Sequence, residues 1–475
     1  MEIRDPVNGF VHLSEAEKSI INSTPFQRLR NIKQLGMGHY VYPGSVHTRL
    51  EHSLGTLYIG SQIYDVLAGK HGKYLGRILP ISRENDIERF KNTLRFALLL
   101  HDVGHAPFSH SSEDLSPKGI SHEEMGARVI KAKLEDLFKQ TNISRAGIKI
   151  DDVVYLIYPE MATETPEEAQ IFNLLSSIIS GEIDADRIDY LTRDSHHTGV
   201  IYGKFDYMRL IDTITFIPYI GETLDGHENF DLVPEIPEPR IGLEYGGIHT
   251  VEGLLLARYY MFTQVYFHHI RRIYDLILTD FLKCSLPEGR YPLDVDEYLK
   301  YDDAAIQTMI RECSERGSKD EKFFAQKLLY REHPRRVFEE REQLLNFEKF
   351  KKEVKEALLS KFKDLNPSDI YVDSASKSAY KPTSDDFSII KEEISENLDR
   401  YWDVKKAWQL KEKSNKKIFN VTECSELLNL LRRVGVEILR VYAKVSKKDV
   451  LRAEEVCKEV YDRLREEEER GGLNG

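Results

Sequence analysis

The sequence has few of the residues that would indicate a secreted, membrane-spanning or zinc-finger protein. Its 475 residues include four scattered cysteines, none with zinc-ligand spacing: Cys284, Cys313, Cys424 and Cys457. So few thiols in so long a chain argue against a disulfide framework and fit a reducing cytoplasm. The first residues contain no apolar signal-peptide segment, and no apolar run approaches membrane-spanning length. We therefore expect a cytoplasmic protein without membrane contact.

Net positive charge and a phosphate-binding glycine loop are also missing. The formal charge is −12, from 67 Lys and Arg against 79 Asp and Glu. An acidic chain is not a generic polyanion binder, so a nucleotide would need a local basic pocket and nucleic acid is a disfavoured partner. No Walker-type Gly-Lys-Ser/Thr loop is present, and Gly36-Met-Gly38 lacks the strand and helix of a dinucleotide-binding turn.

Helical periodicity dominates the first 280 residues and predicts a mostly α-helical fold. Apolar residues recur at three- and four-residue spacing in 14–34, 47–68, 88–102, 121–139, 166–180, 184–196, 206–216 and 248–284. The segment Ser-Leu-Pro-Glu-Gly at 285–289 breaks this pattern. We expect a boundary there, between a helical core of residues 1–284 and a C-terminal lobe of residues 285–475.

The C-terminal lobe is predicted to be α+β. Residues 368–372 and 416–421 have the composition of strands between helices, and the Lys and Glu runs in 311–365 are typical of a solvated helix face. In the core, Asn229–Val233 is a candidate strand of a small hairpin.

A histidine and an aspartate follow directly on an apolar helical segment. The run Phe96–Leu100 ends in His101 and Asp102, and burying both is costly unless a metal or a polar partner satisfies them. His52 upstream and Asp186 downstream complete the order His, His-Asp, Asp. Two imidazoles and two carboxylates suit iron, manganese, zinc or nickel. A buried polar network without metal is the alternative.

The flanking motifs carry a family resemblance. They are Asp5-Pro-Val-Asn-Gly9, Pro25-Phe-Gln-Arg-Leu-Arg30, Ile32-Lys-Gln-Leu-Gly36, Tyr42-Pro-Gly44, Arg49-Leu-Glu-His52-Ser, His101-Asp-Val-Gly-His105 and Asp194-Ser-His-His-Thr-Gly199. With the four candidate ligands, they resemble the HD-domain deoxynucleoside triphosphate (dNTP) triphosphohydrolases, both the bacterial dGTPase type and the animal type with a sterile-alpha-motif domain. Residues 1 to about 275 match, and weaker matches return at Tyr330-Arg331, Ile370–Asp373 and Leu439–Lys444.

The resemblance implies a metal-dependent hydrolysis. His52, His101, Asp102 and Asp186 would hold the metal, with magnesium on the substrate phosphates. Hydroxide on the metal would attack the α-phosphate, releasing a deoxynucleoside and inorganic triphosphate. His110 would be the general acid that protonates the leaving oxygen, because histidine titrates near physiological pH. Glu113 would orient His110, and His122 would contact phosphate.

The resemblance also outlines a nucleotide pocket. Arg49, Arg187 and Arg258 would neutralise the triphosphate, since arginine pairs with phosphate in a bidentate manner. Gln34 and Asp194 would hold the sugar 3′-hydroxyl, Tyr266 would exclude a 2′-hydroxyl, and Leu35 would lie beside the base. His105 and Tyr190 complete this predicted set. For Tyr266 a role as a core aromatic is the alternative, and His105 has an equal alternative as a structural histidine.

Some relatives are oligomers activated by nucleotides, so the resemblance implies a homo-oligomer (dimer or tetramer) and a nucleotide activator. Residues matching activator-binding positions are Gln27, Arg30, Arg209, Arg331 and Arg335. Asn22 and Met1, however, replace an Asp and a Lys that guanine-specific activation would use, and Glu244 and Gly246 replace basic residues of a second site. An Asn cannot supply the charge-assisted acceptor of an Asp.

The sequence therefore predicts a dNTP triphosphohydrolase with an HD-domain catalytic core and an oligomerisation or regulatory lobe. Two alternatives stay open. One is an HD phosphodiesterase or phosphatase acting on another nucleotide, and the other is a nucleotide- or nucleic-acid-binding regulator with a vestigial site.

Overall fold

The computed structural model describes residues 1–78, 84–117, 119–163, 166, 169–219, 238–378, 388–391, 410 and 417–472. The chain begins with an antiparallel hairpin of β1 (Glu2–Asp5) and β2 (Gly9–His12), in which Asp5 pairs with Gly9. Short helices α1 (Glu15–Ile21) and α2 (Thr24–Arg28) follow. The hairpin packs on α3, which places its turn next to the helical core.

The helical core forms around α3 (Arg49–Ile78), which packs on α4 (Glu84–Leu100) and α10 (Ala185–Thr198). The other helices of this part are α5 (His122–Lys133), α6 (Glu135–Phe138), α7 (Thr141–Arg145), α8 (Ile150–Ile157), α9 (Ala169–Ile179) and α11 (Tyr207–Thr213). Apolar side chains of these helices are almost completely buried in one large core. The mostly helical prediction is confirmed.

Four predicted helices differ in detail from the structure. The segment 121–139 is divided into α5 and α6. The segment 14–34 is divided because Ser23 and Pro25 begin α2 as a new helix. The segment 206–216 ends at Thr213, where the chain enters β3. The segment 248–284 is divided into α12 (Ile248–Met261), a π-helical turn at Phe262–Tyr266, and α13 (His269–Ser285). Such turns with i to i+5 bonding are frequent at functional sites.

Two sheets complete the described fold. The first has the order β3 (Ile214–Tyr219), β4 (Glu238–Glu244), β7 (Ser388–Ile390), β8 (Ile418–Asn420). The second has the order β5 (Arg335–Glu340), β9 (Gly435–Ala443), β6 (Ile370–Ser378). The predicted strands 368–372 and 416–421 correspond to β6 and β8, whereas the candidate strand 229–233 lies outside the described residues.

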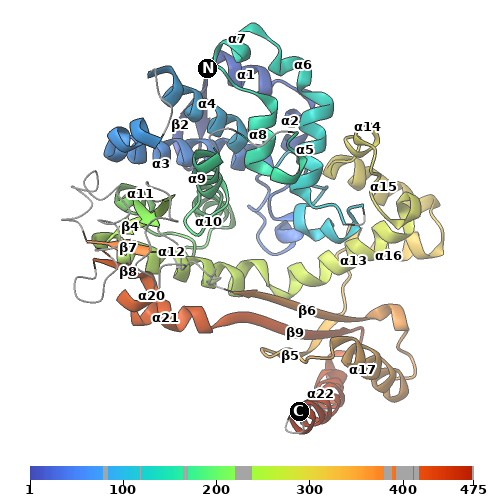
Figure 1. Ribbon diagram of the computed structural model, residues 1–475. Helices are drawn as coiled ribbons and strands as arrows, with labels where there is room; N and C mark the ends of the chain where they lie inside the picture. The colour runs from blue at the N-terminus through green and yellow to red at the C-terminus, as the bar shows by residue number, and fades with distance from the viewer. Residues whose placement is uncertain are drawn as a thin grey trace.

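The C-terminal lobe has a core of its own. Helices α17 (Phe347–Lys361) and α22 (Val450–Gly472) pack together and, with β5, β9 and β6, enclose this second core. The long helix α13 runs between this sheet and the helical part of the molecule (Figure 1). The remaining helices of this region are α14 (Val295–Tyr298), α15 (Asp303–Arg316), α16 (Lys319–Leu329), α20 (Val421–Cys424) and α21 (Glu426–Arg433).

The chain after residue 285 also contributes to the first core. Strand β7 runs parallel to β4, and Ile389 and Ile390 are fully buried with the residues of the helical part. Because residues on both sides of position 285 share this core, the division into a core of residues 1–284 and an α+β lobe of residues 285–475 stays a prediction. None of the described helices is long and apolar enough to cross a membrane.

Candidate metal centre and nucleotide pocket

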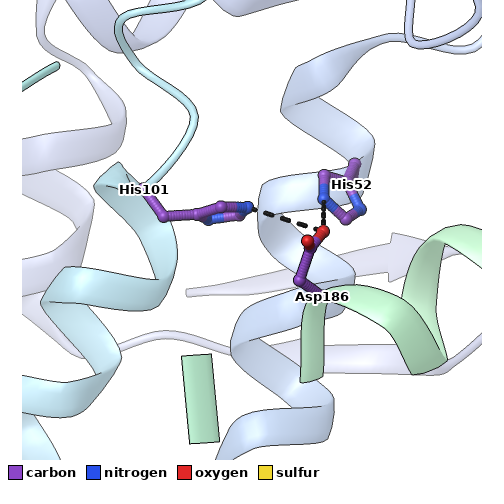
Figure 2. A group of neighbouring side chains, drawn as sticks. All are labelled: His52, His101 and Asp186. Carbon is purple, nitrogen blue, oxygen red and sulfur yellow. Dashed lines mark ion pairs between the residues drawn. The ribbon is translucent and has the colours of Figure 1, made fainter. Parts of the chain in front are cut away.

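The four predicted metal ligands come together from three helices. His52 lies one turn into α3, His101 and Asp102 follow the last residue of α4, and Asp186 lies in the first turn of α10. His52 Nε2 is 2.9 Å from Asp186 Oδ1 and 3.6 Å from Asp102 Oδ2, and His101 Nε2 is 3.5 Å from Asp102 Oδ1. Figure 2 shows His52, His101 and Asp186 pointing toward one another.

The ligand nitrogens are suited to a metal. The Nε2 atoms of His52 and His101 are buried and have no hydrogen-bond partner among the described residues. Each ring instead uses its other nitrogen: His101 Nδ1 donates to Leu98 O (2.8 Å) and His52 Nδ1 donates to Asp189 Oδ2 (2.9 Å). These bonds leave the Nε2 atoms facing carboxylates, where a proton or a metal can bind them. The residues therefore fit a divalent first-row metal.

The electrostatic field at this position favours positive charge. Burial opposes the protonation of His52, but the carboxylates of Asp186, Asp189 and Asp102 raise its pKa to about 10. Asp102 is fully buried and is ion-paired to Arg49, whose Nη1 donates to Asp102 Oδ2 at 2.6 Å. Arg49 also donates to Ser109 Oγ (2.9 Å), so it links the candidate metal centre to the loop after α4.

Three histidines and one glutamate form a second cluster beside the metal ligands. Glu113 accepts from His110 Nδ1 (2.6 Å) through one oxygen and from His122 Nδ1 (2.7 Å) through the other. His105 stacks on His122 with ring centroids 3.9 Å apart, and its Nε2 is 3.2 Å from Asp102 Oδ1. Burial and the Arg49 charge lower the pKa of His105 well below its usual range. Burial disfavours the charged form of His122, but Glu113 raises its pKa.

The loop that carries His110 has an unusual backbone. Phe108 and Ser109 both have left-handed φ values, 58° and 54°. Asp303 at the start of α15 holds this loop, because its Oδ1 accepts from Phe108 N (2.7 Å) and its Oδ2 accepts from Lys33 N (3.1 Å). Burial raises the pKa of Asp303 to about 6.

A cavity of about 670 Å³ lies against both clusters. It is lined by all nine residues predicted for the substrate: Gln34, Leu35, Arg49, His105, Arg187, Tyr190, Asp194, Arg258 and Tyr266. The cavity is also lined by His101, Asp102, Asp186, His110 and His122. His52 and Glu113 contact these lining residues but do not line the cavity themselves. The structure therefore brings the predicted metal, catalytic and substrate residues into one place.

Two predicted substrate residues have unpartnered polar atoms in this cavity. Arg258 is 3% exposed, and its Nε and Nη1 have no hydrogen-bond partner among the described residues. Gln34 is also buried, and its Oε1 has no partner in the same part of the chain. Since buried polar groups are costly without a partner, these atoms are suited to a polar ligand. Arg187 is already paired with Glu182 and with Asp184.

Asp194 and Tyr266 hold each other. Tyr266 Oη donates to Asp194 Oδ2 (2.7 Å), and His47 Nε2 donates to Asp194 Oδ1 (2.7 Å). Each carboxylate oxygen keeps a second lone pair, so Asp194 can still accept from a hydroxyl group. Tyr266 is packed edge-on against Phe262 and Tyr190.

Sequence reasoning did not find several residues of the site. Asp189 contacts His52, and its position about one helical turn after Asp186 was a usable signal. His47 contacts Asp194, but its position before α3 gave no such signal. Arg271 and Asp275 of α13 and Lys377 of β6 line the cavity as well. No sequence pattern near Lys377 indicates that this residue lies in the site. Strand β6 lies at the cavity because segments far apart in the sequence pack together.

The predicted activator residues lie outside this cavity. Gln27 Nε2 donates to Ile21 O (2.8 Å), Arg30 Nε donates to Gln27 Oε1 (3.1 Å), and Arg331 Nη2 donates to Tyr40 O (3.1 Å). Arg209 on α11 and Arg335 on β5 are exposed. Glu244 accepts from Lys70 Nζ (2.9 Å), so its negative charge is paired. Activator binding at these residues stays a proposal.

Comparison with known proteins agrees with this geometry. Residues 49–194 match the HD domain, and residues 234–399 match the HD associated region. An uncharacterized protein of Methanocaldococcus jannaschii is 35% identical over 309 residues, 65% of this chain and 54% of that protein. The deoxynucleoside triphosphate triphosphohydrolase SAMHD1 of Homo sapiens is 30% identical over 305 residues, 60% of this chain and 44% of that protein.

A solved structure resembles nearly the whole chain. The crystal structure of a hypothetical protein from Aquifex aeolicus has a TM-score of 0.69 at 29% identity, over 96% of this chain and 99% of that chain. The chain spans about half the length of the curated relatives it matches. It belongs to the HD-domain family. The relatives it resembles include a protein named as a dNTP triphosphohydrolase.

Proposed function

We propose that the protein hydrolyses deoxynucleoside triphosphates at the α-phosphate, giving a deoxynucleoside and inorganic triphosphate. The observation that carries the proposal is one cavity lined by three of the four candidate metal ligands, by arginines and by the histidines of the second cluster. The human relative bears the name of this activity, at 30% identity. A divalent metal, when bound by His52, His101, Asp102 and Asp186, supplies Lewis acidity that activates water and withdraws charge from the phosphoryl group.

The arginines of the cavity bind the triphosphate. Arg49 is fixed by Asp102 and Ser109 beside the ligands, so its charge is oriented before substrate arrives. Arg258 is buried, its Nε and Nη1 have no hydrogen-bond partner in the part of the chain that the structure describes, and phosphate oxygens would satisfy them. Arg187, though paired with Glu182, lines the same cavity. Preorganised charge of this kind stabilises the charge that develops on the transferred phosphoryl group.

His110 supplies the proton for the leaving group. Water adds to the α-phosphorus, the bond from that phosphorus to the 5′ oxygen breaks, and His110 gives its Nε2 proton to this oxygen. Glu113 holds Nδ1 at 2.6 Å, which fixes the ring and leaves Nε2 as the transferable site. His122, on the other oxygen of Glu113, faces the same cavity and would contact the phosphates.

The sugar is held by Gln34 and Asp194, and Tyr266 excludes a 2′-hydroxyl. Leu35, His105 and Tyr190 complete the wall. A homo-oligomer with nucleotide activation is part of the proposal, through Gln27, Arg30, Arg209, Arg331 and Arg335.

The test is a product assay. Purified protein is incubated with Mn²⁺ and each deoxynucleoside triphosphate, singly and mixed, with ribonucleotides in parallel. Deoxynucleoside with intact triphosphate is the expected result, and activity only in mixtures would identify an activator. Mono- or diphosphate products would contradict the proposed bond cleavage and favour a different HD-domain phosphohydrolase. Metal binding without turnover would favour a binding regulator.

A further inference from the structure

The N-terminal turn Asp5-Pro-Val-Asn-Gly9 lies outside the cavity, yet it contacts the candidate metal centre from behind. Asn8 Nδ2 donates to Asp189 Oδ1 (3.2 Å), and Arg193 Nη1 donates to Asp5 Oδ1 (2.7 Å). Asp189 and Arg193 belong to α10, the helix that also carries Asp186. The turn and α10 therefore share a buried network.

Asp189 determines how His52 presents its ring. The Nδ1 proton of His52 is donated to Asp189 Oδ2 at 2.9 Å, and both side chains are completely buried. A carboxylate on Nδ1 fixes the ring orientation and the tautomer with a free Nε2, and makes that nitrogen a better ligand. Among the described residues, the hydrogen-bond partner of His101 Nδ1 is neutral, the Leu98 carbonyl. His52 is therefore oriented by a carboxylate, whereas His101 is oriented by a neutral carbonyl group.

Asp189 is itself held on both oxygens. Arg193 Nε donates to Oδ2 (2.8 Å) and Arg193 Nη2 donates to Oδ1 (2.9 Å), which is the bidentate pairing of a guanidinium with a carboxylate. Gly55, on the next turn of α3 after His52, makes space for this pair, because a Cβ there would overlap with both side chains. The close approach of α3 at Gly55 and the two bonds from Arg193 therefore define the position of the Asp189 carboxylate.

Asp5 completes the network from the hairpin. Its Oδ2 accepts from the backbone N of Val7 (3.1 Å) and of Asn8 (2.6 Å), so the turn is rigid, while its Oδ1 accepts from Arg193. Two buried carboxylates and one guanidinium leave one net negative charge. This charge lies next to His52, where it favours positive charge, either a proton on the ring or a bound metal.

We propose that Asp189, held by Arg193, Asp5 and Asn8, is the positioning residue for His52, and that the N-terminal turn thereby sets the metal affinity. This inference rests on the proposed metal site but not on the substrate or the reaction. It gives the Asp5–Gly9 motif a role in metal binding, although none of its residues lines the cavity.

The experiment measures the Mn²⁺ affinity of the metal-stripped full-length protein by competition with a chelator. Asp189→Asn keeps the size of the side chain but removes its charge, and we expect binding to be about 10- to 100-fold weaker. Asn8→Ala removes a single hydrogen bond to Asp189, and we expect about two- to tenfold weaker binding with a native fold. Circular dichroism and thermal unfolding of the metal-stripped proteins report folding separately.

Asp369→Asn is the matched control. Asp369 is also a buried carboxylate paired to a cation, Lys327 Nζ at 2.8 Å, but in the C-terminal lobe. It should lose stability and keep the Mn²⁺ affinity of the wild type. The inference is overturned if Asp189→Asn or Asn8→Ala folds and binds Mn²⁺ as tightly as the wild type, or if Asp369→Asn weakens binding equally. A wild-type protein that binds no Mn²⁺ would instead overturn the proposed metal site itself.

Discussion

The role proposed for Tyr266 predicts that its ring and its hydroxyl group have separate functions. In the proposed function the ring would close the cavity against a 2′-hydroxyl group, whereas the tyrosine hydroxyl group donates to Asp194 Oδ2 at 2.7 Å. Tyr266→Phe removes only the bond. Asp194 is 1% exposed and Tyr266 7%, so the lost hydrogen bond to a buried carboxylate should lower the free energy of unfolding by about 1.5–3 kcal/mol. The loss should lie at the low end because His47 still donates to Asp194.

Tyr266→Ala removes the ring as well. Truncating a buried aromatic costs about 3–5 kcal/mol in unfolding free energy, and it opens the wall beside the sugar. The assay compares kcat/KM for each deoxynucleoside triphosphate with that for the matching ribonucleotide. We expect Tyr266→Phe to keep the wild-type ratio and Tyr266→Ala to lose about 10- to 100-fold of it, the range for steric rejection of one hydroxyl group. Equal ratios in the two variants would refute the assignment of the sugar gate to this ring.

Three further predictions concern the metal, the proton and pH. Replacing His101 and Asp102 together by Ala should remove bound metal and activity while circular dichroism keeps its helical signal; activity that survives metal loss would contradict the mechanism. His110→Ala should keep the metal content, measured by elemental analysis, and lower kcat by about 10²- to 10⁴-fold, whereas an unchanged kcat would exclude His110 as the acid. Because the folded pKa of Asp303 is raised from 3.8 to about 6, its contribution to stability is fully present below pH 3.8 and is lost as pH rises through 6. Between pH 4 and 7 the wild type should therefore lose about 2 kcal/mol more unfolding free energy than Asp303→Asn, as urea titrations would show, and parallel pH curves would reject the raised pKa.

Much of the site could be predicted because its residues lie in short, ordered motifs. His52, His101, Asp102 and Asp186 were found from residue type and order, and the structure places their ligand atoms within a few ångströms of one another. Helical periodicity also located α3, α4 and α10, which position them. These patterns involve residues that are close together in the sequence, so they can be recognised without knowledge of the tertiary structure.

Other parts of the site depend on contacts between distant segments. Lys377 reaches the cavity only because β6 packs against α13, and Asp303 holds the Phe108 loop from a helix nearly 200 residues away. The division of the helix around Phe262–Tyr266 has no Pro or Gly to announce it. Strands β5 and β9 were not predicted either, and each pairs with a strand far away in the sequence.

The measurement that tests the central claim most directly is turnover of a deoxynucleoside triphosphate in ¹⁸O-labelled water with Mn²⁺. The account predicts label on the α-phosphoryl end of the released triphosphate, with an unlabelled deoxynucleoside, because water attacks the α-phosphorus and the 5′ oxygen leaves. Label in a monophosphate or in orthophosphate would place the attack on another phosphorus–oxygen bond. Label in the deoxynucleoside would place it on carbon, and either result would contradict the proposed chemistry.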